Sequence, residues 1–237
     1  MTEQQDLAGR VAVVTGASRG IGAAVAEALA MEGVHVVLTA RSAAELEQVE
    51  ERIHQSGGAA TIAPLDLAQQ DGVARLAAAL AERWDRLDIL VISAAYLPLL
   101  TPVAHIDGKE FNKALIVNVL ATQALLASFD PLLRRAPAAR VIGLTSSVAS
   151  SSRPYWGAYG ATKAAFEVLL DAYGQEVANI SNTRVAIIDP GATRTGMRPR
   201  AFPGEDAATL KPPAVVGARI TQLLRADFPS GHRERID

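Results

Sequence analysis

Short apolar runs alternate along the chain with longer segments whose apolar residues recur at helical spacing. The apolar runs predict strands over residues 11–15, 34–38, 59–65, 87–92, 140–145, 184–188 and 233–236. Most are rich in Val and Ile with little polar alternation, which is typical of parallel strands covered on both faces. The pattern therefore predicts an α/β fold, a doubly wound parallel sheet of about seven strands with helices on both faces.

Helices are predicted between the strands by periodicity and by end signals. They cover residues 21–32, 69–84, 107–129, 159–178 and 214–224, with a further helix that Ser42 caps and Gly57 ends. Pro131 follows the long helix 107–129 and is expected to lie just beyond its end. Residues 195–213 hold four prolines and two glycines, which predicts an irregular segment. Since no linker or repeat interrupts the pattern, we expect one domain over residues 1–237.

Composition narrows the class of protein. The chain has 237 residues, 49% of them apolar, a net charge of −2 and no cysteine. These values give no indication of nucleic-acid or anionic-membrane binding, and they exclude disulfides and thiolate chemistry. The polar start, residues 1–6, is unlike a signal peptide, and the longest apolar run, residues 114–129, contains polar residues that favour a buried helix over a membrane span. We expect a cytoplasmic protein.

Three glycines follow the first predicted strand and open a helix. Gly16 would make the turn, Gly20 would leave room for a phosphate, and Gly22 would let helix and strand pack closely. The exposed N–H groups and the positive end of the helix dipole would then form an anion site.

The same letters also match G-x-S-x-G, the nucleophile turn of serine hydrolases, with a triad of Ser18, Asp189 and His232 in chain order. However, only ten residues precede the first strand, so no earlier loop could supply an oxyanion hole. The hydrolase turn has no use for Gly22 either. A nucleotide cradle is the favoured interpretation.

A second group of residues is expected at the same edge of the sheet. Tyr159 and Lys163 are four residues apart at the start of a predicted helix, and Ser146 ends the fifth strand. A lysine beside a phenol favours the phenolate and lowers its pKa; reaching neutrality from about 10 needs about 3 units, or roughly 4 kcal/mol. The carboxyl ends of parallel strands form the ligand crevice, so a hydroxyl donor, a tyrosine and the glycine turn converge there.

With these motifs in this order, the chain resembles a short-chain dehydrogenase/reductase of the compact, single-domain, Rossmann type over essentially its whole length. The motifs that carry the resemblance are Thr15-Gly16-x-x-x-Gly20-x-Gly22, Asp66, Asn118, Ser146, Tyr159-x-x-x-Lys163 and Pro190-Gly191. More narrowly, Trp156 to Tyr159, residues 190–195, Met197-Arg198 and residues 201–203 resemble a bacterial reductase subgroup of unassigned substrate.

The resemblance implies four catalytic residues. Tyr159 would be the general acid for carbonyl reduction and the base for alcohol oxidation, and Lys163 would bind the nicotinamide ribose and lower the pKa of Tyr159. Ser146 would hydrogen-bond the substrate oxygen, and Asn118 would hold a water in a proton relay. Ser147 is an adjacent alternative, but family spacing and strand alternation favour Ser146.

The resemblance also implies a nicotinamide cofactor. Members selective for NAD carry an acid after the second strand, whereas this chain has Thr39-Ala40-Arg41-Ser42. Arg41 and Arg19 would flank a 2′-phosphate, so NADP is expected rather than NAD. Asp66 would accept from the adenine amino group or cap a helix. The implied cofactor-binding set is Gly16, Ser18, Arg19, Gly20, Ile21, Gly22, Arg41, Asp66, Leu67, Ala94, Ala95, Tyr159, Lys163, Pro190, Gly191, Thr193 and Thr195.

One segment departs from the family, which usually has Asn-Asn-Ala-Gly after the fourth strand. Here it reads Ile92-Ser93-Ala94-Ala95, so an asparagine that ties adjacent strands is missing. No histidine has ligand-spaced partners, and no metal site is expected. Arg194, Arg198 and Arg200 could contact substrate or belong to a solvated loop.

Taken with the family, these features imply an NADP-dependent oxidoreductase for a small-molecule carbonyl or alcohol substrate. A 3-oxoacyl thioester reductase is one candidate within that class, and an idle NADP-binding regulatory protein is the alternative outside it. A homodimer or homotetramer through helices 107–129 and 159–178 is expected, because both helices are apolar on more than one face.

Overall fold

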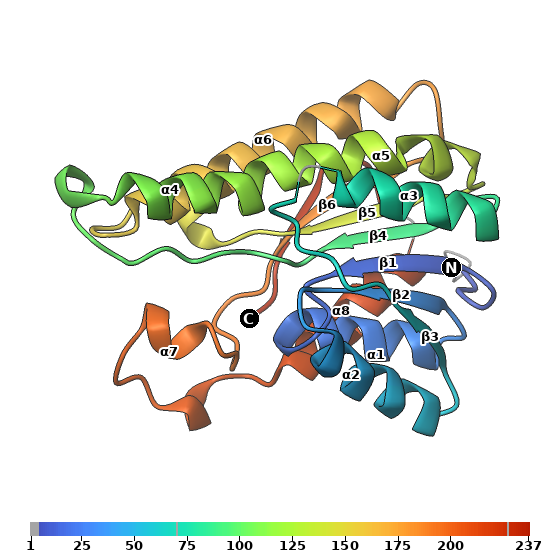
Figure 1. The fold of residues 1–237 in the computed structure, drawn as a ribbon, viewed down its shortest axis with the longest axis horizontal. Coiled ribbons are helices and arrows are strands. Elements are labelled where there is room, and N and C mark those ends of the chain that lie inside the picture. Colours follow the sequence, from blue (N-terminus) through green and yellow to red (C-terminus); the bar gives the residue numbers. More distant parts are fainter. Residues whose placement is uncertain (1–4, 70, 227) are drawn as a thin grey trace.

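A seven-stranded sheet forms the centre of the computed structural model, which describes residues 5–69, 71–226 and 228–237 (Figure 1). The strand order is β3-β2-β1-β4-β5-β6-β7, and every neighbouring pair is parallel. The strands are β1 (Val11–Thr15), β2 (His35–Thr39), β3 (Ala59–Ile62), β4 (Ile89–Ile92), β5 (Arg140–Leu144), β6 (Arg184–Asp189) and β7 (His232–Arg235). The predicted doubly wound parallel sheet is confirmed.

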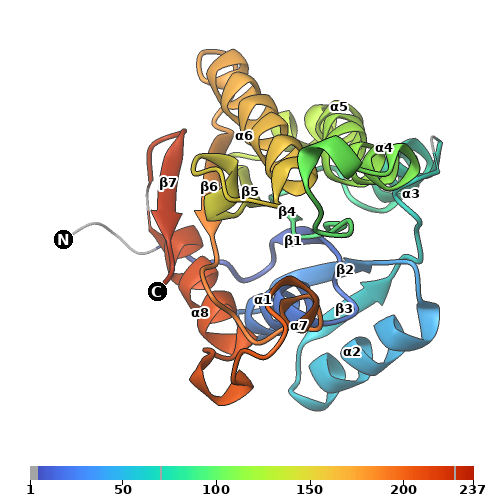
Figure 2. The ribbon, with the colours of Figure 1, turned by 90° about the vertical axis from the view of Figure 1, so that its left-hand side faces the viewer.

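Helices cover both faces of the sheet (Figure 2). One face carries α1 (Gly20–Met31), α2 (Ala43–Gln55) and α8 (Pro213–Arg225), and the other carries α3 (Gly72–Arg83), α4 (Gly108–Leu115), α5 (Ala121–Arg135) and α6 (Gly157–Val177). Each face has its own apolar core, because alternate residues of each buried strand point to opposite sides. The short α7 (Arg198–Ala201) lies beyond the carboxyl ends of the strands (Figure 1).

The long helix differs from its prediction at two places. It begins where predicted, with Asp107 as its cap accepting from the Lys109 amide at 2.7 Å, but a π-helical turn over Ile116–Leu120 separates α4 from α5. The helix then continues through Pro131 to Arg135 rather than ending near residue 129. Pro131 is exposed while the next two residues, Leu132 and Leu133, are buried, so core packing outweighs the hydrogen bond that proline cannot donate.

By length and composition alone, the helical stretch Gly108–Arg135 could cross a membrane, a criterion that the core helix of a globular protein also meets. Here it packs against α3 and α6.

The irregular segment 195–213 contains only α7 and a 3₁₀ turn at Ala207–Thr209. Of the predicted elements, Gln70 in helix 69–84 and the polar residues 1–4 lie outside the described part of the chain.

The edge strand β7 is held by ion pairs as well as by its ladder to β6. Its four residues, His-Arg-Glu-Arg, are partly or fully exposed. Arg233 binds Glu167 and Asp171 of α6, Glu234 binds Arg219 of α8 at 2.5 Å, and Arg235 lies 3.7 Å from Asp189 of β6. These pairs connect the strand to both helical layers.

Candidate active site

Three positions of the turn after β1 require glycine, two for backbone conformation and one for space. Gly16 and Gly20 have φ angles of +67° and +59°, in the left-handed region that favours glycine. A Cβ at Gly22 would lie 2.2 Å from the carbonyl oxygen of Gly16, so the first turn of α1 packs directly on the loop. No side chain in the described parts of the chain caps α1, so its first amides are left without a side-chain partner there. This arrangement suits the phosphate site expected from the sequence.

The tie between β1 and β4, which the sequence placed in doubt at Ser93, is made by Thr15. Its Oγ1 accepts hydrogen bonds from the backbone amides of Ser93 at 3.0 Å and Ala94 at 3.1 Å. A Cβ on Gly16 would lie 2.9 Å from the Cα of Ala94, so the two loops are in close contact. Thr15 was part of the motif, but its position across from β4 is a long-range property that the sequence did not reveal.

The segment after β6 also reaches the glycine turn. A Cβ at Gly20 would lie 3.5 Å from the Thr195 side chain, which puts Thr195 beside the glycine turn. Thr193 donates to the Pro190 carbonyl at 2.9 Å, and Lys211 donates to the Ile236 carbonyl at 2.8 Å. Lys211 and the backbone of residue 236 thereby brace this loop, a role with no sequence signal.

Two exposed arginines lie near the end of β2. Arg19 is 3.9 Å from Glu45, and its side chain is 73% exposed; Arg41 is also exposed. The Oγ1 of Thr39 is buried without a partner in the described residues. Asp66 accepts from the Ala68 amide at 3.0 Å, while Asp71 stands at the cap position of α3, so Asp66 is not that helix's cap. With no acid after β2, the residues present are compatible with a nicotinamide dinucleotide that carries a 2′-phosphate.

Tyr159 is on the first turns of α6, in a small apolar cluster with Leu97 and Val148. Its ring meets Trp156 edge-on at a centroid distance of 6.0 Å, and the residue is 6% exposed. Burial, with a smaller contribution from the Asp189 carboxylate, raises the pKa of Tyr159 above its ordinary value. In the protein without cofactor both influences act in the same direction, and no lowering of the Tyr159 pKa by Lys163 accompanies them.

Lys163 lies one turn further along α6 and is 2% exposed. Its ammonium donates to the Leu144 carbonyl at 2.7 Å and lies 6.0 Å from the centre of the Tyr159 ring. Burial lowers the pKa of Lys163 to about 8, and the Glu167 carboxylate opposes that shift. The lysine is therefore charged at neutral pH but close to losing its proton under mildly basic conditions.

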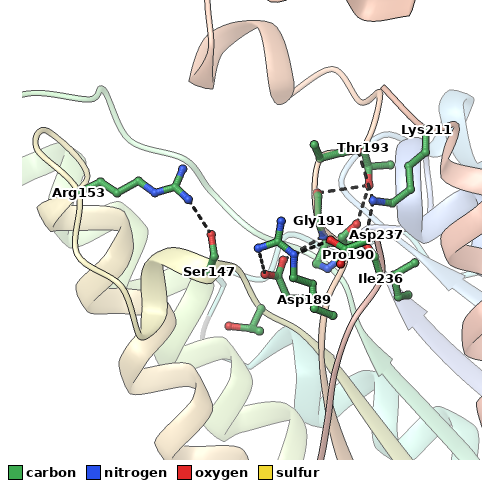
Figure 3. A network of polar contacts seen from close by, with 12 residues as sticks. Ser147, Arg153, Asp189, Pro190, Gly191, Thr193, Lys211, Ile236 and Asp237 are labelled. Atoms are coloured by element: carbon green, nitrogen blue, oxygen red, sulfur yellow. Dashed lines mark hydrogen bonds and ion pairs between the residues drawn. The ribbon is translucent and has the colours of Figure 1, made fainter. Parts of the chain in front are cut away.

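The two adjacent serines after β5 have different surroundings. Ser146 is extended, with φ of −157°, and its hydroxyl has no protein partner within the described ranges. Ser147 begins a 3₁₀ turn and accepts from Arg153 at 3.4 Å (Figure 3). Ser146 therefore has the hydroxyl that is available to a ligand.

Asn118 lies in the π-helical turn and is buried. Its Oδ1 accepts from the Tyr96 amide at 2.7 Å, and its Nδ2 donates to the Tyr96 carbonyl and to Thr162 Oγ1, both at 2.9 Å. Both amide hydrogens are thus used within the protein. One lone pair on Oδ1 is left for the expected water.

Two of the three arginines at the irregular segment have partners within the protein. Arg198 binds Glu205 through two hydrogen bonds of 2.5 and 2.6 Å and stacks 3.8 Å from the centre of the Phe202 ring. Arg200 donates to the Leu97 carbonyl at 2.9 Å, and Arg194 is exposed. The apolar side chains Met197 and Ala201 pack onto the Tyr159 cluster, so this segment presents an apolar wall to the site.

These features define a dinucleotide-type α/β sheet with a buried tyrosine–lysine pair at its carboxyl edge. The chain belongs to the short-chain dehydrogenase family, whose model matches residues 10–206. It is 36% identical over 232 residues to the uncharacterized oxidoreductase YciK of Escherichia coli K12, a match that covers 94% of this chain and 90% of that protein.

Solved structures agree with this assignment. A short-chain dehydrogenase structure from Shigella flexneri 2a, complexed with NADP, has a TM-score of 0.92 at 33% identity and covers 98% of this chain and 99% of that one. One from Escherichia coli CFT073, complexed with NADPH, has a TM-score of 0.92 at 34% identity and covers 98% of each chain. The protein is thus an oxidoreductase of this family.

Proposed function

We propose that the protein uses NADPH to reduce the carbonyl group of a small, largely apolar substrate, with Tyr159 as the general acid. The observation that carries this proposal is the buried phenol of Tyr159, one helical turn from the ammonium of Lys163 and at the same sheet edge as the Ser146 hydroxyl. A raised pKa keeps the phenol protonated at neutral pH, which is the state that carbonyl reduction requires. The NADP and NADPH complexes of two relatives support the choice of cofactor.

When bound, NADPH supplies the hydride for the carbonyl carbon. The amides of the turn from Gly16 to Gly22, with Ser18, Thr193 and Thr195, would hold the pyrophosphate, and Arg19 and Arg41 would hold the 2′-phosphate. Asp66, Leu67, Ala94 and Ala95 would line the adenosine side, and Pro190 and Gly191 the nicotinamide side. The glycine turn, the uncapped start of α1 and the missing acid after β2 support this placement.

The chain's own groups would handle the proton and the oxygen. Ser146 would donate a hydrogen bond to the substrate oxygen, and Tyr159 would transfer its proton there as negative charge develops. Lys163 would bind the ribose and stabilise the phenolate that remains. Asn118 would hold a water on its free lone pair, through which solvent returns the proton to Tyr159.

The substrate class can be tested with a panel of carbonyl compounds, read by NADPH absorbance. Because Arg198 and Arg200 are held within the protein, neutral aromatic and aliphatic ketones or aldehydes are expected to outperform carboxylate-bearing ones. A 3-oxoacyl thioester belongs in the same panel as a separate arm. If no member is turned over while NADPH still binds, the idle regulatory protein replaces the enzyme as the better hypothesis.

Replacing Arg41 by Ala is expected to weaken NADPH binding about 10- to 100-fold and to leave NADH binding unchanged, since a charge-assisted hydrogen bond is worth about 1.5–3 kcal/mol. Fluorescence titration with both cofactors measures the effect. Arg75→Ala, an exposed arginine on α3, is the matched control. Tighter binding of NADH than of NADPH by the unaltered protein would contradict the assignment of the 2′-phosphate site.

We also infer a cytoplasmic homodimer or homotetramer that associates through the long helices, 107–129 and 159–178. In support, Leu120 and Val168 on these helices are 60% and 66% exposed. Val168→Glu is expected to shift the mass measured by light scattering toward a single chain. Met31→Glu, at a 75% exposed site on α1, should leave the mass unchanged. A single-chain mass for the unaltered protein would rule out the assembly.

A further inference from the structure

Glu167 lies on α6, four residues after Lys163, and its carboxylate is only 13% exposed. Both oxygens are occupied. Oε1 accepts from Thr145 Oγ1 at 2.5 Å, and Oε2 accepts from Arg233 Nη1 at 2.5 Å. A largely buried acid with two defined partners is fixed in position rather than moving freely in solvent.

The carboxylate and the Lys163 ammonium reach consecutive residues of the same strand end. Lys163 donates to the carbonyl of Leu144, and Glu167 accepts from the side chain of Thr145, which is followed directly by Ser146. Side chains four residues apart on a helix are neighbours on one face. The two side chains therefore share one face of α6, next to the end of β5 that leads to the proposed catalytic serine.

Glu167 is the acid whose field acts on Lys163, where it opposes the effect of burial. Tyr159 also faces the ammonium, with its ring centre 6.0 Å away. Five other charged groups on α6 or on the elements packed against it have partners of their own. Glu110 and Lys113 of α4 contact Tyr96, and Asp130 of α5 binds Arg134 and Tyr173. Asp171 of α6 binds Arg233, and Asp189 of β6 accepts from the Gly191 amide. Arg233 of β7 is the cation bound to Glu167.

We propose that Glu167 is a positioning residue of the active site, whose carboxylate keeps the Lys163 ammonium protonated and anchors the end of β5 that carries Ser146. Arg233 of β7 in turn fixes the carboxylate. This inference rests on the proposed function only for its catalytic consequence. The proposed coupling of Glu167 to Lys163 concerns the chain alone and requires neither substrate nor turnover.

The test is direct because the chain has only four lysines, Lys109, Lys113, Lys163 and Lys211. Protein labelled with ¹³C-lysine gives four side-chain signals, and Lys163→Met identifies the signal of interest. In Glu167→Gln without cofactor, the NMR pKa of Lys163 is expected to fall by about one unit. Asp171→Asn is the matched control: it removes an acid that binds the same guanidinium, one turn further from Lys163, and should leave the titration unchanged.

Arg233→Gln gives the test from the opposite side and remains usable if Glu167→Gln folds poorly. It removes the cation bound to Glu167, so the pKa of Lys163 is expected to rise. A Lys163 titration that stays at the wild-type value in both variants overturns the proposal and leaves Glu167 as an anchor for β7 only. An equal fall in Asp171→Asn and Glu167→Gln also overturns it.

Turnover separates this inference from the proposed function. If the enzyme is active, Glu167→Gln should lower the rate at pH 8 about fivefold and move the basic limb of the pH profile to lower pH, as the fraction of protonated Lys163 falls. The NMR shift is expected whether or not a substrate is found. A shift without turnover in any variant would count against the proposed function and in favour of the coupling.

Discussion

Tyr159→Phe is expected to lower kcat for carbonyl reduction by about 10²- to 10⁴-fold while NADPH binding stays within a few-fold, because only the transferable proton is lost. Phenylalanine keeps the ring that packs on Trp156 and Leu97, so the surrounding structure should not change. Stopped-flow measurement of NADPH oxidation gives the rate, and fluorescence titration gives the affinity. The effect is expected to be one of the largest available from a single atom.

Tyr173→Phe is the matched control for that variant. Tyr173 is a second buried tyrosine on α6, its pKa is also raised by burial, and its hydroxyl donates to Asp130 at 3.0 Å, away from the strand ends. Its replacement should cost about 1 kcal/mol of stability and leave turnover unchanged. Turnover of Tyr159→Phe within a few-fold of the wild type would remove Tyr159 from the role of acid.

Gly22→Ala is expected to weaken NADPH binding more than about 100-fold and to lower stability by about 1–3 kcal/mol. The added methyl would lie 2.2 Å from the Gly16 carbonyl oxygen and 2.7 Å from its carbon. Both are backbone atoms of the turn, so the loop has to move away from the helix start that it shares. Urea unfolding and fluorescence titration measure the two effects.

Gly108→Ala is the control that separates crowding from the general effect of replacing a glycine near the start of a helix by alanine. Gly108 is the first residue of α4, and a Cβ there has no atom within 4 Å. Alanine has the higher helix propensity, so this variant should be neutral or slightly more stable. NADPH affinity that survives Gly22→Ala would mean that the cofactor does not use this turn.

The sheet and the helices around it could be predicted from the sequence, because each strand is a local apolar run and each helix has local end signals. The predicted helix end before Pro131 was wrong for a physical reason. Proline usually ends a helix, but here the burial of Leu132 and Leu133 stabilises the helix beyond it. The π-helical turn around Asn118 was also missed. It depends on contacts with Tyr96 and Thr162 that no local pattern contains.

The candidate site could be predicted where a residue's role follows from its spacing along the sequence. It was harder to predict where the role depends on contacts between residues far apart in the sequence. The structure brings Tyr159, Lys163 and Ser146 together at one sheet edge, as the carboxyl-end rule predicts. Burial raises the pKa of Tyr159 in the protein without cofactor, an effect that the order of residues does not reveal. The effects of Asp189 on Tyr159 and of Glu167 on Lys163 could not be predicted either. They depend on the position of β6 in the sheet and on the face of α6 that carries the site.

The charged side chains of β7 affect whether another chain can add a strand to this edge of the sheet. An edge strand offers unpaired N–H and C=O groups to any passing chain, which is a route to aggregation. On β7 the arginines at 233 and 235 and the glutamate at 234 are engaged with partners in their own chain. A foreign strand that docked here would have to bury these guanidinium groups or break their ion pairs. The β7 edge of the sheet is therefore protected against the addition of a further strand.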